Sequence, residues 1–84
     1  MAITVRIPTN LFAIDGSTVE LDPAPPDLKA LIAELDRRFP GIEAALNSSA
    51  VNAAVNGEII LSDRDGTQLA DGDEVEFLMM FAGG

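Results

Sequence analysis

The sequence contains neither cysteine nor histidine. The lack of cysteine excludes disulfide bonds and thiolate nucleophiles, and the lack of both residue types excludes the usual ligands of a zinc site. Without histidine, the chain also has no side chain that ordinarily exchanges a proton near neutral pH. We therefore expect a protein that is not an enzyme in its own right and that binds no metal ion or cofactor.

Basic residues are scarce as well, because 5 Lys and Arg residues stand against 14 Asp and Glu residues, for a formal net charge of -9 at pH 7. Such a charge repels nucleic-acid phosphates and anionic membrane surfaces. We expect no nucleic-acid partner and no membrane association. A basic protein is the natural complement to this chain.

Long apolar stretches are missing too. The longest run of apolar side chains extends from Phe77 to Ala82, which is far shorter than the roughly 20 residues that cross a bilayer as a helix. The amino-terminal residues Met1–Arg6 lack the charged segment, apolar run and cleavage site of a signal peptide. We expect one cytoplasmic domain over residues 1–84, with 81–84 as a flexible carboxyl-terminal tail.

A helix over residues 27–39 is the clearest secondary-structure prediction. Apolar residues with the spacing of one helical stripe occur at Leu28, Leu31, Ile32, Leu35 and Phe39. Asp27 at the start and Arg37 and Arg38 in the last turn match the helix dipole. Glu34 is placed to form an i, i+4 ion pair with Arg38. Pro40 ends the helix.

Alternating apolar and polar residues predict strands on both sides of this helix. Residues 3–7 and 18–21 predict a hairpin whose connection is long or irregular. The connector Asp22–Pro26 contains three prolines, which exclude a central strand or a helix interior. After the helix, residues 42–46 favour one short helical turn.

The carboxyl-terminal half predicts three more strands. Val51–Val55 and Glu58–Leu61 flank Asn56-Gly57, the preferred pair for a two-residue hairpin turn. A tight turn at 71–73 leads into a last strand from Glu74 to about Met80. One main helix on one face of a mixed sheet of four to five strands is an α+β fold. Its element order matches the β-grasp, or ubiquitin-like, arrangement, with the first and last strands parallel at the sheet centre.

The last strand presents two different faces. In the predicted arrangement Val75, Phe77 and Met79 face the helix, while Leu78 and Met80 point to the opposite face. The acids Glu74 and Glu76 share that opposite face, where one of them can pair with Arg6. Leu78 and Met80 are either covered by a loop, such as residues 8–14, or form a docking patch for partner enzymes beside the tail.

The sequence closes with two glycines, separated from Phe81 by Ala82 alone. The α-carboxyl group of Gly84 is ionised at pH 7, and it is a poor electrophile until adenylation by ATP converts it into a mixed anhydride. Gly83 and Gly84 have no side chain to obstruct a narrow tunnel, and four extended residues from Phe81 reach at most about 13–14 Å. This ending predicts a tail that enters the active site of a separate activating enzyme.

Five segments carry a resemblance to a known family, namely Ile3–Ile7, Leu28–Pro40, Val55–Glu58, Asp71–Val75 and Ala82–Gly84. On these segments the chain resembles the sulfur carrier family, which includes the small subunit of molybdopterin synthase, the carrier of thiazole synthesis and the carrier of one bacterial route to cysteine. The resemblance implies that a ubiquitin-activating-like enzyme adenylates Gly84 with ATP. It also implies that a sulfur donor converts Gly84 into a thiocarboxylate and that Gly83 allows entry to the active sites.

The resemblance extends to one branch of this family. Val5–Leu11 and Ala82–Gly84 are more similar to the cysteine-route carrier, which implies a cysteine-synthase-like enzyme as the acceptor of sulfur. The molybdopterin subunit, whose acceptor is the large subunit of that synthase, tends to carry a proline that Phe77–Phe81 lacks. The chain is also longer than a typical thiazole carrier.

Two other functions remain open from the sequence. The first is a protein modifier that is joined through Gly84 to target lysines; since Lys29 is the only lysine, chains of this protein would grow only there or at the amino terminus. The second is an interaction module whose terminus is chemically idle.

Overall fold

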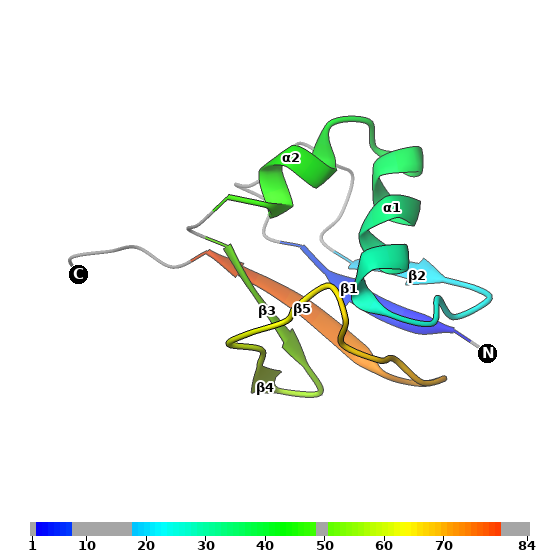
Figure 1. The fold of residues 1–84 in the computed structure, drawn as a ribbon. Helices are drawn as coiled ribbons and strands as arrows, with labels where there is room; N and C mark the ends of the chain where they lie inside the picture. Colours follow the sequence, from blue (N-terminus) through cyan, green and yellow to red (C-terminus); the bar gives the residue numbers. More distant parts are fainter. Residues whose placement is uncertain (1, 8–17, 49–50, 80–84) are drawn as a thin grey trace.

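The computed structural model describes residues 2–7, 18–48 and 51–79 as one sheet with both helices on the same face (Figure 1). Its elements are β1 (Ile3–Arg6), β2 (Thr18–Leu21), α1 (Leu28–Arg38), α2 (Ile42–Leu46), β3 (Val51–Val55), β4 (Glu58–Ile59) and β5 (Glu74–Met79). The five strands form a sheet in the order β2-β1-β5-β3-β4. The predicted α+β, β-grasp architecture is confirmed.

The first and last strands lie side by side in the middle of the sheet. β1 runs parallel to β5 with Val5 opposite Val75, and it pairs antiparallel with β2 on its other side. The alternation in β1 explains its orientation, because Ile3 and Val5 are buried under the helices while Arg6 is exposed. β5 is therefore held between two neighbours, as the sequence predicted.

Helix α1 begins at a side-chain cap. The Asp27 carboxylate accepts a hydrogen bond from the N–H of Ala30 (2.8 Å), which satisfies a backbone donor of the first turn. At the other end, the N–H of Phe39 donates to the carbonyl of Leu35 (2.7 Å). The helix is one residue shorter at each end than predicted, because Asp27 and Phe39 serve as its caps.

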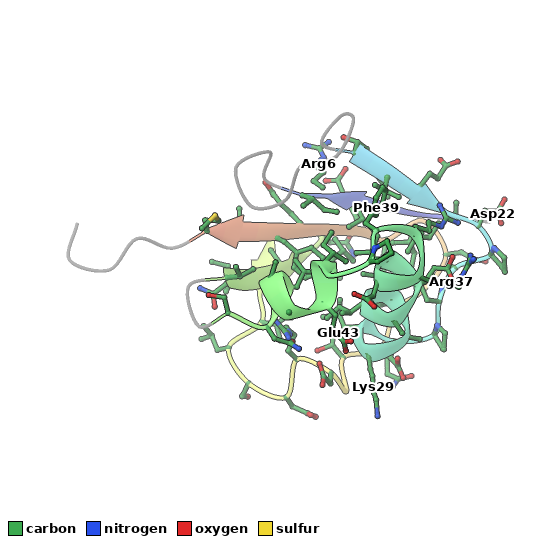
Figure 2. All side chains as sticks on the ribbon, turned by 90° about the horizontal axis from the view of Figure 1, so that it is seen from above. Arg6, Asp22, Lys29, Arg37, Phe39 and Glu43 are labelled. Carbon is green, nitrogen blue, oxygen red and sulfur yellow. The ribbon has the colours of Figure 1, made fainter. Side chains whose placement is uncertain are left out.

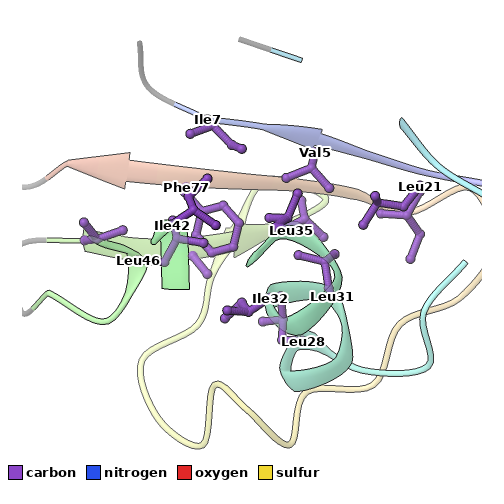
Figure 3. Close-up of a cluster of buried hydrophobic side chains, with 14 residues drawn as sticks. Val5, Ile7, Leu21, Leu28, Leu31, Ile32, Leu35, Ile42, Leu46 and Phe77 are labelled. Atoms are coloured by element: carbon purple, nitrogen blue, oxygen red, sulfur yellow. The ribbon is translucent and has the colours of Figure 1, made fainter. Parts of the chain in front are cut away.

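One apolar core lies between the sheet and the helices (Figure 3). The stripe of α1 is buried at Leu28, Leu31, Ile32 and Leu35. From α2 the core receives Ile42 and Leu46, and from β5 it receives Val75 and Phe77. Within the described parts of the chain, no polar or charged residue is buried. The core therefore depends on hydrophobic burial and packing.

A carboxylate from α1 organises the start of α2. The Asp36 side chain accepts hydrogen bonds from the N–H groups of Gly41 (3.0 Å) and Glu43 (3.1 Å). Gly41 has a φ of 100°, in the left-handed region that glycine adopts without steric cost. This turn reverses the chain after α1 and places the predicted short helical segment 42–46 against the core.

The hairpin turn between β3 and β4 is also as predicted. Asn56 has a φ of 52° and Gly57 a φ of 85°, the two positive values that this turn requires. β4, however, contains only Glu58 and Ile59, so the predicted strand Glu58–Leu61 was too long. Arg64 supplies a physical reason, because its guanidinium donates to the carbonyl of Leu46 (2.9 Å) and draws the chain away from β3 towards α2.

Candidate functional site

The candidate site lies where β5 leads into the carboxyl-terminal residues. Val51 of β3 is the register partner of Met79, the last residue of β5. Met80 and the predicted tail, which comprises Phe81, Ala82, Gly83 and Gly84, lie outside the described residues. The structure describes β5 and its neighbouring strands, which precede these residues in the chain.

Burial and pairing both hold β5 in place. Val75 is 0% exposed and Phe77 1% exposed, so the helix-facing side of the strand is fixed in the core. β3 pairs with β5 over all five of its residues, from Val51 to Val55. Met79 also faces the helix side by register, but it is only half-buried at the end of the strand.

A clamp between the β3–β4 turn and the start of β5 was not predicted from the sequence. The Asn56 side chain donates to the Asp73 carboxylate (3.0 Å) and accepts from the N–H of Glu74 (2.9 Å). The backbone N–H of Asn56 donates to the carbonyl of Glu74 (2.7 Å). Asp73 in turn accepts from the N–H of Ala70 (2.8 Å). The clamp fixes the turn that begins β5.

The clamp also changes the acidity of Asp73. Hydrogen bonds from the Asn56 side chain and from the Ala70 N–H lower the pKa of the Asp73 carboxyl, since both stabilise its ionised form. The only sequence signal for this contact was the pair of turn motifs, Asn56-Gly57 and Asp71–Asp73. Nothing in their spacing along the chain showed that the two turns would meet.

The outer face of β5 carries charge at one end and an apolar residue at the other. Arg6 pairs with Glu74 (3.1 Å), which settles the predicted choice between Glu74 and Glu76. Both side chains are about half exposed, so the pair contributes little to stability. Leu78 is half-buried and lies opposite Asn52 of β3. Of the predicted docking patch, the structure therefore describes Leu78, whose register partner is Asn52, while Met80 lies outside the described residues.

A second ionic network lies on α1, away from β5. Glu34 accepts hydrogen bonds from Arg37 and Arg38, which confirms the predicted pair with Arg38 and adds Arg37. Arg37 and then Arg38 lower the pKa of the Glu34 carboxyl from 4.5 to about 2, and Glu34 raises the pKa of Arg37. Figure 2 shows Arg37 on the outside of α1 and the exposed Lys29 extending outward near the start of that helix.

The described residues include no group of three or more His, Cys, Asp or Glu side chains that is arranged to hold a metal ion. No helix in the described part of the chain is long and apolar enough to span a membrane.

Comparison with known families gives a match to the model of the ThiS family over residues 5–84. The chain belongs to the ThiS family. The match includes β5 and the terminal glycines, and it confirms the predicted resemblance to the ubiquitin-like sulfur carriers. A comparison with curated proteins finds no match.

Three solved structures are similar to this chain over nearly its whole length. In the complex of BexX and CysO from Amycolatopsis orientalis, the matched chain is 30% identical with a TM-score of 0.83, over 99% of this chain and 100% of that one. CysO from Mycobacterium tuberculosis, described as an antigen, is 31% identical with a TM-score of 0.77, over 94% and 99%. A chain in the complex of subunits 1 and 2 of the Helicobacter pylori molybdopterin-converting factor is 26% identical with a TM-score of 0.64, over 100% of both chains.

These relatives confirm the broad function predicted from the sequence. The chain is a sulfur carrier of the ThiS and CysO type, and such proteins are small carriers without an enzymatic activity of their own. Two of the three similar structures are complexes with a second protein, which agrees with a function that depends on protein partners.

Proposed function

We propose that this member of the ThiS family carries sulfur as a thiocarboxylate on Gly84 in the cytoplasm. In the first step, an oxygen of the Gly84 carboxylate attacks the α-phosphate of ATP, and pyrophosphate leaves. In the second step, hydrosulfide released by a sulfur donor attacks the acyl carbon, and AMP leaves with one former carboxylate oxygen, so that sulfur replaces that oxygen. Both steps take place in a separate, ubiquitin-activating-like adenylating enzyme, and this chain supplies only the carboxyl group.

The observation that best supports this proposal is the position of β5. The strand that leads to Gly84 has a partner on each side, β1 and β3, and its helix-facing residues Val75 and Phe77 are buried. Because β5 is fixed in the sheet, only the residues after it have to be ordered when they enter an active site, which lowers the entropy cost of binding. Four residues from Phe81 to Gly84 span at most about 13–14 Å, a reach that suits a buried catalytic group.

We further propose cysteine biosynthesis as the route that receives the sulfur, through a cysteine-synthase-like acceptor. The segments Val5–Leu11 and Ala82–Gly84 support this branch, and both CysO structures have higher TM-scores than the molybdopterin-converting factor. Molybdopterin synthesis, with the large synthase subunit as acceptor, is the second candidate. The Helicobacter pylori complex supports it because its matched chain is covered completely.

Partner enzymes are proposed to recognise the outer face of β5 next to the tail. Leu78 is half-buried there, and the sequence pattern predicts that Met80 belongs to the same patch. Methionine repacks readily against different surfaces, which suits a carrier that serves an activating enzyme and then an acceptor. The net charge of -9 favours basic partner surfaces around this patch.

Intact-mass spectrometry tests the proposal directly. The protein is incubated with ATP, an adenylating enzyme competent on ThiS proteins and a sulfur donor, and the expected product has one oxygen exchanged for sulfur at its carboxyl terminus. Omitting ATP is the control. Adducts to lysines of other proteins would instead indicate a protein modifier, and an unchanged mass would contradict both activities. Transfer of the sulfur to an acceptor enzyme of either route then identifies the branch.

A further inference from the structure

The clamp at Asn56 contains a chemically unstable dipeptide. Asn56 is followed by Gly57, whereas the other asparagines, Asn10, Asn47 and Asn52, are followed by Leu, Ser and Ala. An asparagine loses its amide when the backbone nitrogen of the next residue attacks the side-chain carbonyl carbon, and a side chain on that next residue obstructs the attack. Glycine has no side chain, so Asn56 is the asparagine of this chain that is most prone to the reaction.

The reaction converts an amide into a carboxylate in two balanced steps. The Gly57 nitrogen forms a bond to Cγ of Asn56, and Nδ2 takes up the Gly57 amide proton and leaves as ammonia, which gives a five-membered cyclic imide. Water then opens the imide. Cleavage of the bond to Cγ gives aspartate, and cleavage at the other carbonyl gives isoaspartate, in which the backbone passes through the former side chain. Nothing is oxidised or reduced, and water is the only co-reactant.

Both reacting residues are accessible to water. Asn56 and Gly57 are exposed, and a Cβ atom added at Gly57 would meet nothing within 4 Å apart from its chain neighbours. The space that the cyclic imide and the attacking water require is therefore open. Hydrogen bonds, rather than packing, restrain this dipeptide.

The clamp holds both polar atoms of the reacting amide. Asn56 Nδ2 donates to the Asp73 carboxylate (3.0 Å), and Asn56 Oδ1 accepts from the N–H of Glu74 (2.9 Å). Ring closure requires the amide to rotate towards the Gly57 nitrogen and requires Nδ2 to leave. Both movements break hydrogen bonds of the clamp, so the reaction proceeds from molecules in which the clamp has opened.

Either product of the reaction prevents the clamp from closing again. Aspartate at position 56 has no Nδ2 donor, and its carboxylate lies opposite the Asp73 carboxylate, at the place where the 3.0 Å hydrogen bond was. Two carboxylates at such a distance repel each other. Isoaspartate lengthens the backbone of a two-residue turn that sets the register of β3 and β4. Because ammonia is lost, the change is not reversed.

We propose that Asn56-Gly57 is a deamidation site that the clamp keeps unreactive in the folded chain, and that deamidation there permanently opens the turn from which β5 begins. An intact molecule keeps the amide bonded to Asp73 and Glu74. A molecule whose clamp has opened is converted and then stays less stable. The site therefore gives the chain a one-way loss of stability that acts on the strand preceding the tail, and it is independent of the chemistry proposed for Gly84.

Peptide-resolved mass spectrometry measures the reaction. The full chain is incubated in mildly alkaline buffer, either folded or unfolded in guanidinium chloride, and is then digested with trypsin, which yields residues 39–64 as one peptide. Deamidation raises the mass of this peptide by about one unit, and fragment ions assign the change to Asn47, Asn52 or Asn56. We expect Asn56 to react first, at least about tenfold more slowly in the folded chain than in the unfolded one. Earlier reaction at another asparagine, or equal rates in both states, would overturn the proposal.

Two variants separate the clamp from overall stability. Asp73→Ala removes the acceptor of Asn56 Nδ2 and keeps the reactive dipeptide. Ile42→Val weakens the core, where Ile42 is fully buried, and leaves the clamp intact. In buffer where circular dichroism shows both variants to be folded, Asp73→Ala is expected to deamidate at least about threefold faster than the wild type, because one hydrogen bond to the amide is lost, and Ile42→Val at the wild-type rate. An unchanged rate in Asp73→Ala, or equal acceleration in both variants, would overturn the proposal.

The aspartate product can be made directly by substitution. Asn56→Asp keeps a residue that suits the positive φ of this turn and removes the donor of the clamp. Gln68→Glu makes the same amide-to-carboxylate change at another exposed position and serves as the control. Asn56→Asp is expected to melt at least about 4 °C below the wild type, and Gln68→Glu at the wild-type temperature. Equal melting temperatures for Asn56→Asp and the wild type would show that deamidation does not open the clamp.

Discussion

Substitution of Asn56 tests the clamp that holds the start of β5. The residue has two separable roles. Its backbone adopts a φ of 52° in the hairpin turn, and its side chain joins Asp73 and the N–H of Glu74. Asn56→Gly keeps the turn conformation and removes the side-chain bonds, whereas Asn56→Ala removes the bonds and also places a side chain that disfavours positive φ at this position.

The expected losses of stability follow from these contacts. Each hydrogen bond is worth about 0.5–1.5 kcal/mol, and the exposure of Asn56 favours the lower half of that range, so Asn56→Gly should lose about 1–2 kcal/mol. Asn56→Ala adds about 1–2 kcal/mol for the left-handed conformation, for a total of about 2–4 kcal/mol. A domain of 84 residues has a free energy of unfolding of roughly 4–13 kcal/mol, so the Ala variant loses a large part of it.

Urea unfolding at pH 7, followed by circular dichroism, measures both variants. The midpoints should fall in the order wild type, Asn56→Gly, Asn56→Ala, while the slope of the unfolding free energy against urea concentration stays unchanged. An Ala variant as stable as the Gly variant would refute the conformational argument. Two variants as stable as the wild type would show that the clamp contributes nothing to folding.

Three further predictions concern the tail, the docking patch and the ionic network on α1. Deletion of Gly84 should abolish thiocarboxylate formation without changing the melting temperature; sulfur loading of the truncated protein, seen by intact mass, would contradict the assigned role. Met80→Glu should weaken binding to the adenylating enzyme, measured by calorimetry, with little change in the melting temperature. If the free energy of binding and the free energy of unfolding fall by the same amount, Leu78 and Met80 have a structural role only. Because the folded-state pKa of Glu34 is lowered from 4.5 to about 2, its stabilising contribution is present above pH 4.5 and is lost as the pH falls towards 2. The urea midpoints of the wild type and Glu34→Gln should therefore differ at pH 7 and converge near pH 2, and a constant difference would refute the assignment.

Much of the fold could be predicted because its signals are local. The apolar stripe of α1 and the alternation of β1 are properties of neighbouring residues, and each requires one buried face. Asn56-Gly57 likewise encodes its own turn. The chain order of these elements then limited the possible architectures enough to favour the β-grasp fold.

The end of β4 could not be predicted in this way. The apolar residues Ile60 and Leu61 continue the pattern of a strand, yet Leu61 is 90% exposed. The deciding interaction joins Arg64 to the carbonyl of Leu46, 18 positions earlier in the chain. No local propensity records a contact of that range.

The sequence by itself determined the order of the strands and helices and the acidic character of the chain, because these depend on residue types and on spacing within single elements, and it is also the source of the chemistry proposed for Gly84. Only the tertiary structure decided that Asn56 meets Asp73, that Arg6 selects Glu74, and that β4 ends at Ile59. Each of these outcomes depends on which backbone segments lie next to each other. Burial of the common apolar core determines that arrangement, and the polar contacts form because the core has already brought their residues together.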